Sequence, residues 1–366
     1  MSTRGAIGAA ALSVALWVLL IKTRAPASSS GGGSGDGDGD RWLATKYEHL
    51  STLVPLTNSW RFGDATASET MHAALWNGTH WDLTLTNRMS ANASLDILLG
   101  RDVKSSADGV RVLDAGCGWG GTVFALEARR QQALLSSTSL APPPLVRYDG
   151  LTLAPTQARS ANETAVWRGL EDRARFYVGS FEAALPSTAY DVIVAIESLE
   201  HAADLGSCLR HLGSALRAGG LLLVVTDLLV DAARCASSPT LLAAYSAHWC
   251  GPHTAAWGPP ATLGEWQAHL HAAGLRMQTH TDLSRQLYQR PRWALAGYLH
   301  ALLLVHRGAT ALGLEAAAFH ASTQIGGVAR ELLLHDGIIA YTFMVARRAG
   351  ADPADGTASD MGTGLS

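Results

Sequence analysis

The chain has 366 residues, 48% of them hydrophobic and 16% charged, and its 28 basic and 31 acidic residues leave a formal net charge of −3. This composition excludes a disordered polyelectrolyte, which combines low hydrophobicity with high net charge, and it supplies enough apolar residues for one large core or two modest cores. Because the sequence has neither a basic surplus nor a run rich in lysine and arginine, it disfavours nucleic acid, and we expect a small or apolar partner.

The amino terminus contains an uncharged apolar segment, Gly5 to Ile21, which lies between basic residues. Such a segment is at the short end of the length that spans a membrane. A cleaved signal peptide is the alternative, but Lys22 and Arg24 stand where signal peptides usually have uncharged residues. The sequence therefore predicts one N-terminal transmembrane helix as an anchor over residues 1–24 and a flexible Gly/Ser/Asp linker over residues 25–40.

Between Val110 and Ala346, short apolar runs alternate with helical patterns, as in parallel βαβ units. This alternation predicts an α/β fold with a doubly wound, seven-stranded, mostly parallel sheet. The predicted strands are Val110–Asp114, Leu145–Leu151, Ala174–Val178, Asp191–Ile196, Leu221–Thr226, Leu275–Thr281 and Ile338–Ala346. The predicted helices are Gly121–Leu135, Ala154–Gly169, Leu205–Leu216 and Leu263–Ala273, the last of which begins with a capping-box sequence.

The remaining segments divide the chain further. Residues 41–100 are predicted to form an N-terminal helical cover, and the main domain spans 101–348 with insertions at about 228–261 and 283–337. Because ligands bind at the carboxyl edge of such sheets, we expect the cover and the second insertion to lie over that edge. The small, polar residues 349–366 are typical of a disordered tail.

The most informative motif runs from Val112 to Gly121, where an apolar strand ends in an acidic residue, Asp114, and continues into closely spaced glycines. Glycines allow a tight turn and a close approach of the backbone to a ligand, and the following helix presents free amides. The same glycines also satisfy the pattern of a dinucleotide site. Asp114 favours a cationic amino-acid group over the loop, because its carboxylate would repel a pyrophosphate placed there.

At this point the chain resembles the class I S-adenosylmethionine-dependent methyltransferases, in particular the tocopherol, cyclopropane-fatty-acid and glycine-betaine types. The resemblance rests on five stretches in the family's order, namely VLDAGCGWGGT (112–122), YDGLTLAPTQ (148–157), VGSFEAALP (178–186), AIESLEHAAD (195–204) and LRAGGLLLV (216–224). It implies a Rossmann-like methyltransferase fold and an enzyme that uses S-adenosylmethionine as its cofactor.

The resemblance also implies a cofactor site on matching positions of this sequence. Its residues are Asp114, Gly116, Cys117, Gly118, Thr152, Leu153, Gln157, Ser180, Phe181 and Glu197. The glycine-loop residues would hold the methionine end, the next three would lie against ribose and adenine, and Glu197 would line the floor beside the sulfonium. Ser180 would cap the adenine amino group and Phe181 would flank the ring, although the family commonly has an Asp at position 180. Leu153 and Phe181 fit core positions equally well.

Methyl transfer is an in-line displacement to which an enzyme contributes mainly alignment and a dry pocket. A phenol, amine or aromatic carbon acceptor must also lose a proton, and the Glu200-His201 pair is the candidate base. In the alternative interpretation, Glu200 caps the helix that begins near Asp204 and His201 bonds the backbone.

Two aromatic or apolar segments are candidates for covering the site. Tyr47 and the segment around Trp76 and Trp81 either close over the cofactor or belong to an amphipathic covering helix. Residues Trp293 to Val305 are apolar almost all round but too few to span a bilayer. They would wall an acceptor pocket, lie on the membrane or form an ordinary buried helix.

We therefore predict a membrane-anchored enzyme, with its catalytic domain facing the cytosol or plastid stroma, that methylates carbon or oxygen of a small lipophilic or aromatic acceptor. The alternatives are an N-methyltransferase of a small amine or amino acid and a tethered scaffold that only binds S-adenosylmethionine. The four cysteines form no CxxC pair, so neither a metal site nor a disulfide scaffold is predicted. The sequence leaves the oligomeric state open.

Overall fold

The computed structural model describes residues 41–48, 73, 75–79, 81–101, 109–138, 142–183, 185, 189–251, 260–287 and 290–349. The predicted anchor, the linker and residues 350–366 of the predicted tail lie outside these residues. Of the helices in the described ranges, none is both long and apolar enough to cross a membrane. The predicted transmembrane helix therefore remains a prediction.

The described residues fall into two compact units. The sheet unit draws on Asp40–Ala232, Pro260–Tyr288 and the residues from Ile339 onward, and the helical unit draws on Ala233–Pro259 and Gln289–Ile338. The helical unit thus joins two segments that the sequence analysis treats as separate insertions.

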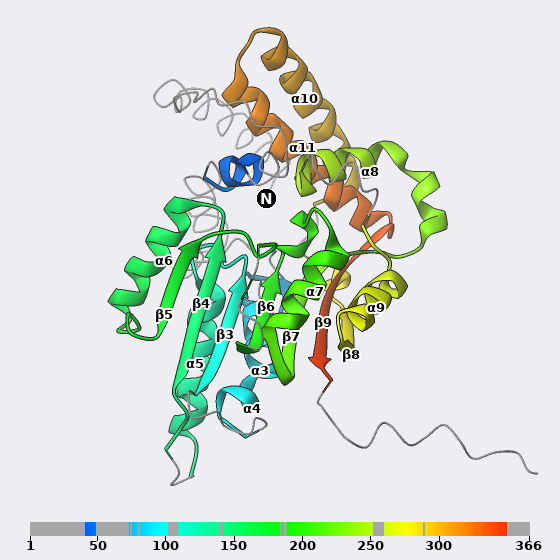
Figure 1. Ribbon diagram of the computed structural model, residues 1–366. Coiled ribbons are helices and arrows are strands. Elements are labelled where there is room, and N and C mark those ends of the chain that lie inside the picture. The colour runs from blue at the N-terminus through cyan, green and yellow to red at the C-terminus, as the bar shows by residue number, and fades with distance from the viewer. Residues whose placement is uncertain are drawn as a thin grey trace, which may run out of the picture. The chain divides into compact units, whose positions relative to one another are not determined.

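The sheet unit contains a seven-stranded sheet with the order β5-β4-β3-β6-β7-β9-β8 (Figure 1). Its strands are β3 Val110–Ala115, β4 Val146–Thr152, β5 Ala174–Val178, β6 Tyr190–Ile196, β7 Leu216–Leu229, β8 Leu275–Asp282 and β9 Ile339–Arg348. Only β9 runs antiparallel to its neighbours, so the predicted seven-stranded, mostly parallel sheet is confirmed. The chain moves outward from β3 to β5 and returns to β6, which creates a ligand-binding switch point at the carboxyl ends of β3 and β6.

Four helices follow the predicted alternation: α5 Gly121–Leu135, α6 Pro155–Trp167, α7 Leu205–Ala215 and α9 Leu263–Ala272. The capping box of α9 is present, since Thr262 and Glu265 each bond the other's backbone amide. Asp204 caps α7 by accepting a hydrogen bond from the Ser207 amide at 3.1 Å. The alternative in which Glu200 caps this helix is therefore wrong.

Strand β7 begins earlier than predicted. Leu216, expected to end the preceding helix, already pairs with Tyr190, and a register irregularity follows before Leu221 pairs with Val192. Gly219 lies within this irregularity at φ +78°, a conformation that favours glycine. The glycines that suggest a turn therefore form an interruption inside a longer strand.

Within residues 41–100, which are predicted to be a helical cover, the structure contains helices and also a small two-stranded sheet. Residues 41–48 are helical, and helices α3 Leu85–Ala93 and α4 Leu95–Leu98 precede β3. Between them, β1 Leu75–Trp76 pairs antiparallel with β2 Trp81–Asp82. A covering helix around Trp76 and Trp81 is therefore wrong, because these residues are extended.

The helical unit is built around α8 Pro239–Tyr245, α10 Arg292–Ala311 and α11 Glu315–His335. Its core includes Leu295 and Leu302 from α10, packed with Ile325 and Val328 from α11. The apolar run from Trp293 to Val305 lies within α10, and only one side of it is buried: the exposed fraction of Trp293 is 74%. Of the three alternatives for this run, the ordinary buried helix therefore applies to one face of α10 only.

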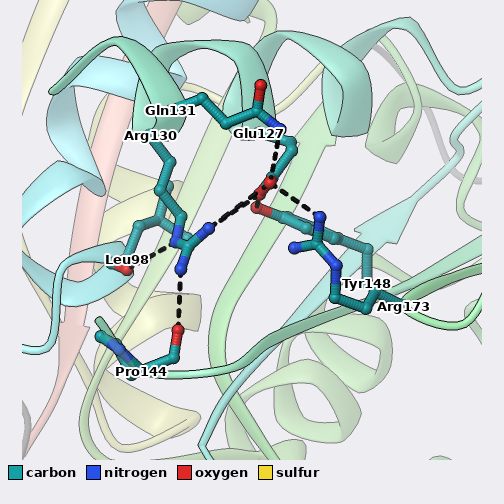
Figure 2. A network of polar contacts seen from close by, with 7 residues as sticks. All are labelled: Leu98, Glu127, Arg130, Gln131, Pro144, Tyr148 and Arg173. Carbon is teal, nitrogen blue, oxygen red and sulfur yellow. Dashed lines mark hydrogen bonds and ion pairs between the residues drawn. The ribbon is translucent and has the colours of Figure 1, made fainter. Parts of the chain in front are cut away.

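A buried polar network joins α5 to β4 in the sheet unit (Figure 2). The carboxylate of Glu127 accepts hydrogen bonds from Tyr148 Oη at 2.8 Å, Gln131 Nε2 at 3.0 Å and Arg173 Nη2 at 3.0 Å. Arg130 contacts the same carboxylate at 3.4 Å and donates to two backbone carbonyls of neighbouring segments. Burial would raise the pKa of Glu127, but the hydrogen bonds outweigh it and lower that pKa.

Candidate active site

Asp114 lies at the end of β3, where the chain enters the glycine loop. Its side chain is buried, and its Oδ2 has no hydrogen-bond partner among the described residues. Burial raises the pKa of this carboxyl to about 7, against the effect of the Thr122 hydroxyl. An unsatisfied buried carboxylate is costly unless a cation approaches it, so Asp114 suits a ligand that brings an ammonium group.

The two glycines after Asp114 have different surroundings. Gly116, at φ +104°, makes room for the segment after β6: a Cβ there would lie 2.4 Å from that of Ser198. Ser198 in turn donates a hydrogen bond to the Ala115 carbonyl at 2.6 Å. Gly118, at φ +51°, faces open space, since a Cβ would meet no described atom within 4 Å. The loop is therefore closed at Gly116 and open to a ligand at Gly118.

The side chain of Cys117 points into the protein interior. The backbone amides of Gly116 and Cys117 both donate to the Leu151 carbonyl, at 3.0 and 2.8 Å. The thiol lies close to Gly150, where a Cβ would come within 2.9 Å of the sulfur. Burial raises the pKa of the Cys117 thiol, as does the neighbouring Asp114. The structure thus places Cys117 in the support of the loop.

The predicted ribose and adenine residues at the end of β4 bond one another. The Thr152 hydroxyl donates to Gln157 Oε1 at 2.8 Å and accepts from the Ala154 amide at 3.2 Å. Thr152 and Gln157 are both buried, whereas Leu153 between them is half-buried. Thr152 and Gln157 brace the turn into α6, and Leu153 keeps a surface that a ligand can reach.

Ser180 and Phe181 follow β5 and are both half-buried. The Ser180 hydroxyl accepts a hydrogen bond from the Glu182 amide at 3.2 Å, which stabilises a local turn. Phe181 packs against a buried hydrophobic cluster that includes residues of β6 and α7. Their contacts with adenine remain predictions.

Glu197 follows β6 in a strained conformation. Its φ of +50° is the only left-handed value for a non-glycine residue within the described ranges. Such a residue costs about 1 kcal/mol or more and is common at functional sites. Its Oε1 accepts a hydrogen bond from the Ala73 amide at 3.1 Å, so the segment just before β1 reaches the end of β6.

His201, which follows β6, is in contact with Tyr47. Its Nε2 lies 2.5 Å from the Tyr47 hydroxyl, and the two rings meet edge to face. Tyr47 belongs to helix 41–48, whose buried Lys46 places its Nζ 5.5 Å from the Tyr47 ring centroid. Glu200 instead contacts the Thr226 hydroxyl on β7, at 3.4 Å. The two predicted base residues therefore have different neighbours.

Sequence reasoning missed two contacts of this site. Tyr47 and His201 are 154 residues apart, and the only signal for their contact is an aromatic residue in a covering segment. The close approach of Ser198 to Gly116 has no local signal. No group of residues suited to a metal ion occurs within the described ranges.

The methyltransferase domain family model matches residues 85–280. The chain is 29% identical over 231 residues to the 27-O-demethylrifamycin SV methyltransferase of Amycolatopsis mediterranei, which covers 62% of this chain and 74% of that protein. It is also 29% identical over 206 residues to a ubiquinone biosynthesis O-methyltransferase of Azorhizobium caulinodans, covering 54% and 71%. Its fold is similar to that of a cyclopropane synthase of Mycobacterium tuberculosis, with a TM-score of 0.55 and 18% identity over 87% of this chain and 100% of that one.

The site fits the cofactor of this family, because a buried carboxylate with an unused oxygen stands beside an open glycine loop. S-adenosylmethionine, rather than a dinucleotide, is the cofactor. Since the family model spans more than half of the sequence, the chain belongs to the methyltransferase domain family and is an S-adenosylmethionine-dependent methyltransferase of class I.

Proposed function

We propose that the enzyme methylates a hydroxyl oxygen on a small, lipophilic acceptor. The observation that carries the proposal is the Tyr47–His201 pair at 2.5 Å, which can take the proton that an acceptor must lose as it attacks a methyl group, and the relatives' names point to oxygen as the attacking atom. The names of two relatives agree with an oxygen acceptor, since one methylates 27-O-demethylrifamycin SV and the other is an O-methyltransferase of ubiquinone biosynthesis.

Residues at the carboxyl ends of β3, β4 and β6 would hold the cofactor. Bound S-adenosylmethionine supplies an electrophilic methyl group on a positively charged sulfur. Asp114 would bind its ammonium group, and the space over Gly118 would admit its methionine end. Leu153 would lie against its nucleoside. Glu197, held by the Ala73 amide, would face the reaction from the end of β6.

The Tyr47–His201 pair would move the proton. The Tyr47 oxygen takes the acceptor's proton as its own passes to His201 Nε2, so the acceptor oxygen keeps the electron pair that forms the new C–O bond. The resulting imidazolium carries the positive charge lost from the sulfur. Glu200, which contacts Thr226 instead, would position the short helical turn Leu199–His201.

A labelled-methyl assay on the full chain tests this proposal against panels of phenols, aliphatic alcohols and secondary amines. His201→Ala and Tyr47→Phe should each lower kcat about 100-fold or more, with the Kd for S-adenosylmethionine changed less than twofold. Arg159→Gln, at an exposed position of α6 outside the site, is the control and should keep the turnover of the wild type. Preferential labelling of amines would overturn the oxygen assignment, and normal turnover in both His201→Ala and Tyr47→Phe would overturn the proton path.

We also propose that residues 1–24 anchor the enzyme with its domain on the cytosolic or stromal side, because tethering raises the encounter rate with a substrate in the bilayer. The support is the uncharged segment Gly5 to Ile21 between basic residues. The full chain should resist carbonate extraction from membranes, whereas a chain that starts at residue 25 should be released and still bind S-adenosylmethionine. Release of both forms would refute the anchor.

A further inference from the structure

A cavity of about 460 Å³ lies on the sheet unit between α3, α5 and the residue that follows α6. Its size is within the range of small-molecule pockets. Apart from Gly121, the last residue of the glycine motif, none of its lining residues belongs to the predicted cofactor site or to the proposed proton path. The cavity is therefore a separate feature whose chemistry can be considered on its own.

The lining of the cavity is basic. It includes Arg88, Arg129 and Arg168 and contains no acidic residue. Arg88 is engaged in an ion pair with Asp82. Arg129 donates through Nε to Asn92 Oδ1 at 2.7 Å, and within the described part of the chain its two Nη groups have no protein acceptor. Arg129 on α5 thus offers its two Nη groups to a ligand.

Another part of the lining is apolar. Phe124, Ala125 and Ala128 come from one face of α5. The guanidinium carbon of Arg168 lies 4.8 Å from the centroid of the Phe124 ring, so this ring helps to orient the arginine. The small alanine side chains leave room beside the ring. The cavity therefore combines oriented guanidinium groups with an apolar floor.

We propose that this cavity binds a phosphate ester, with its phosphate on Arg129 and Arg168 and its apolar part on Ala125 and Ala128. A phosphomonoester carries a charge of about −1.5 to −2 at pH 7 and three acceptor oxygens, which complements two guanidinium groups better than a carboxylate does. A soluble ester and the headgroup of an acidic lipid present the same phosphate. The geometry thus assigns the ligand's chemistry, and its source is decided by experiment.

Titration calorimetry with phenyl phosphate tests the site on the full chain, in the presence of saturating S-adenosylhomocysteine so that the cofactor site is filled. Saturable binding is expected at millimolar concentration, and Arg129→Gln and Arg168→Gln should each weaken it about tenfold. Ala128→Glu, at an exposed helical position, should abolish binding by adding bulk and negative charge without disturbing the core. Arg159→Gln, an exposed arginine of α6 outside the cavity, is the control and should bind normally.

The same variants are then mixed with phosphatidylcholine vesicles with and without phosphatidic acid. Binding of phenyl phosphate that depends on Arg129 and Arg168 supports a soluble ester, and binding only to acidic vesicles with the same dependence supports a lipid headgroup. The proposal is overturned if neither probe binds, or if binding is equal in the wild type, Arg129→Gln, Arg168→Gln and Ala128→Glu. Circular dichroism confirms that each variant is folded.

Discussion

Two buried acidic side chains of the sheet unit, Glu127 and Asp114, differ in what surrounds them. Glu127 is 2% exposed, and hydrogen bonds from three side chains lower the pKa of its carboxyl despite burial (Figure 2). Asp114 is 1% exposed and keeps one oxygen without a partner among the described residues, so burial raises its pKa to about 7. The first is satisfied by the fold, and the second keeps one oxygen available to a ligand.

Their positions in the fold explain this difference. Glu127 joins the side of α5 to β4, whereas Asp114 stands at the carboxyl end of β3, where ligands bind in this type of sheet. A buried charge whose hydrogen bonds are complete supports the structure, and one whose hydrogen bonds are incomplete is a candidate for function. Substitutions at the two positions should therefore separate stability from binding.

The largest expected effect is on stability, at Glu127. Glu127→Ala should lower the free energy of unfolding by about 3–5 kcal/mol, because Arg130 and Arg173 would lose their carboxylate partner in a buried setting. Tyr148→Phe, which removes one hydroxyl from the same network, should cost only about 1 kcal/mol. Urea denaturation measures both. A loss below 1 kcal/mol in Glu127→Ala would show that the network contributes little.

The next effect is on binding, at Asp114. Asp114→Asn should weaken S-adenosylmethionine about 30- to 1000-fold, because the ammonium group loses its charged partner. The free energy of unfolding at pH 8 should not fall, since the variant removes a carboxylate that is costly to ionise in the folded protein. Calorimetry and denaturation provide the two measurements. An affinity within threefold of the wild type would remove Asp114 from the cofactor site.

The smallest expected effect is on how ionisation of Asp114 makes stability and cofactor affinity depend on pH. Because the folded pKa of Asp114 is raised, its stabilising contribution is complete below its unfolded value, about 3.9, and is lost as the pH rises through 7. The cofactor prefers the ionised form, so its affinity should rise about fivefold from pH 6 to 7 and fall again above about 8, where the α-amino group loses its proton. Asp114→Asn should abolish the acid limb in calorimetry from pH 5.5 to 8.5. An acid limb that persists in Asp114→Asn would assign it to another group.

The lowered pKa of Glu127 makes stability change with pH in the opposite direction. Its contribution to stability is present above its unfolded pKa, about 4.3, and is lost as the pH falls through the lower folded value. In the wild type, a fall in pH should therefore weaken the hydrogen bonds around Glu127, whereas it should stabilise the folded protein at Asp114 by protonating that carboxylate. Denaturation of Glu127→Gln between pH 3 and 6 should show a smaller pH dependence than that of the wild type.

Much of the sheet was predictable because its strands are continuous apolar runs. Val110–Asp114 and Asp191–Ile196 were located within one residue of each end, since central parallel strands are buried on both faces. The early start of β7 was missed because its glycines lie at a register irregularity that local sequence cannot distinguish from a turn. The pairing of β1 with β2 was missed because each strand has only two residues.

The candidate site was predictable where a motif lies on one loop. The unpartnered oxygen of Asp114 and the open position at Gly118 belong to one short motif, whereas the Tyr47–His201 contact depends on how a distant helix packs. Sequence also could not show that Thr152 and Gln157 bond each other, because a polar residue beside a ligand and one that braces a turn have the same composition. Tertiary contacts decided each of these cases.

The position of β9 has a consequence for how the chain acquires its structure during synthesis. Strand β9 is the last of the sheet in sequence, yet it lies between β7 and β8 and is the only partner of β8 among the described strands. Until residue 348 has left the ribosome, β7 lacks one neighbour and β8 lacks its sheet partner, so both expose unpaired backbone groups. A nascent chain that stalls before Ile339 should therefore recruit chaperones or aggregate, even though its cofactor loop is already complete.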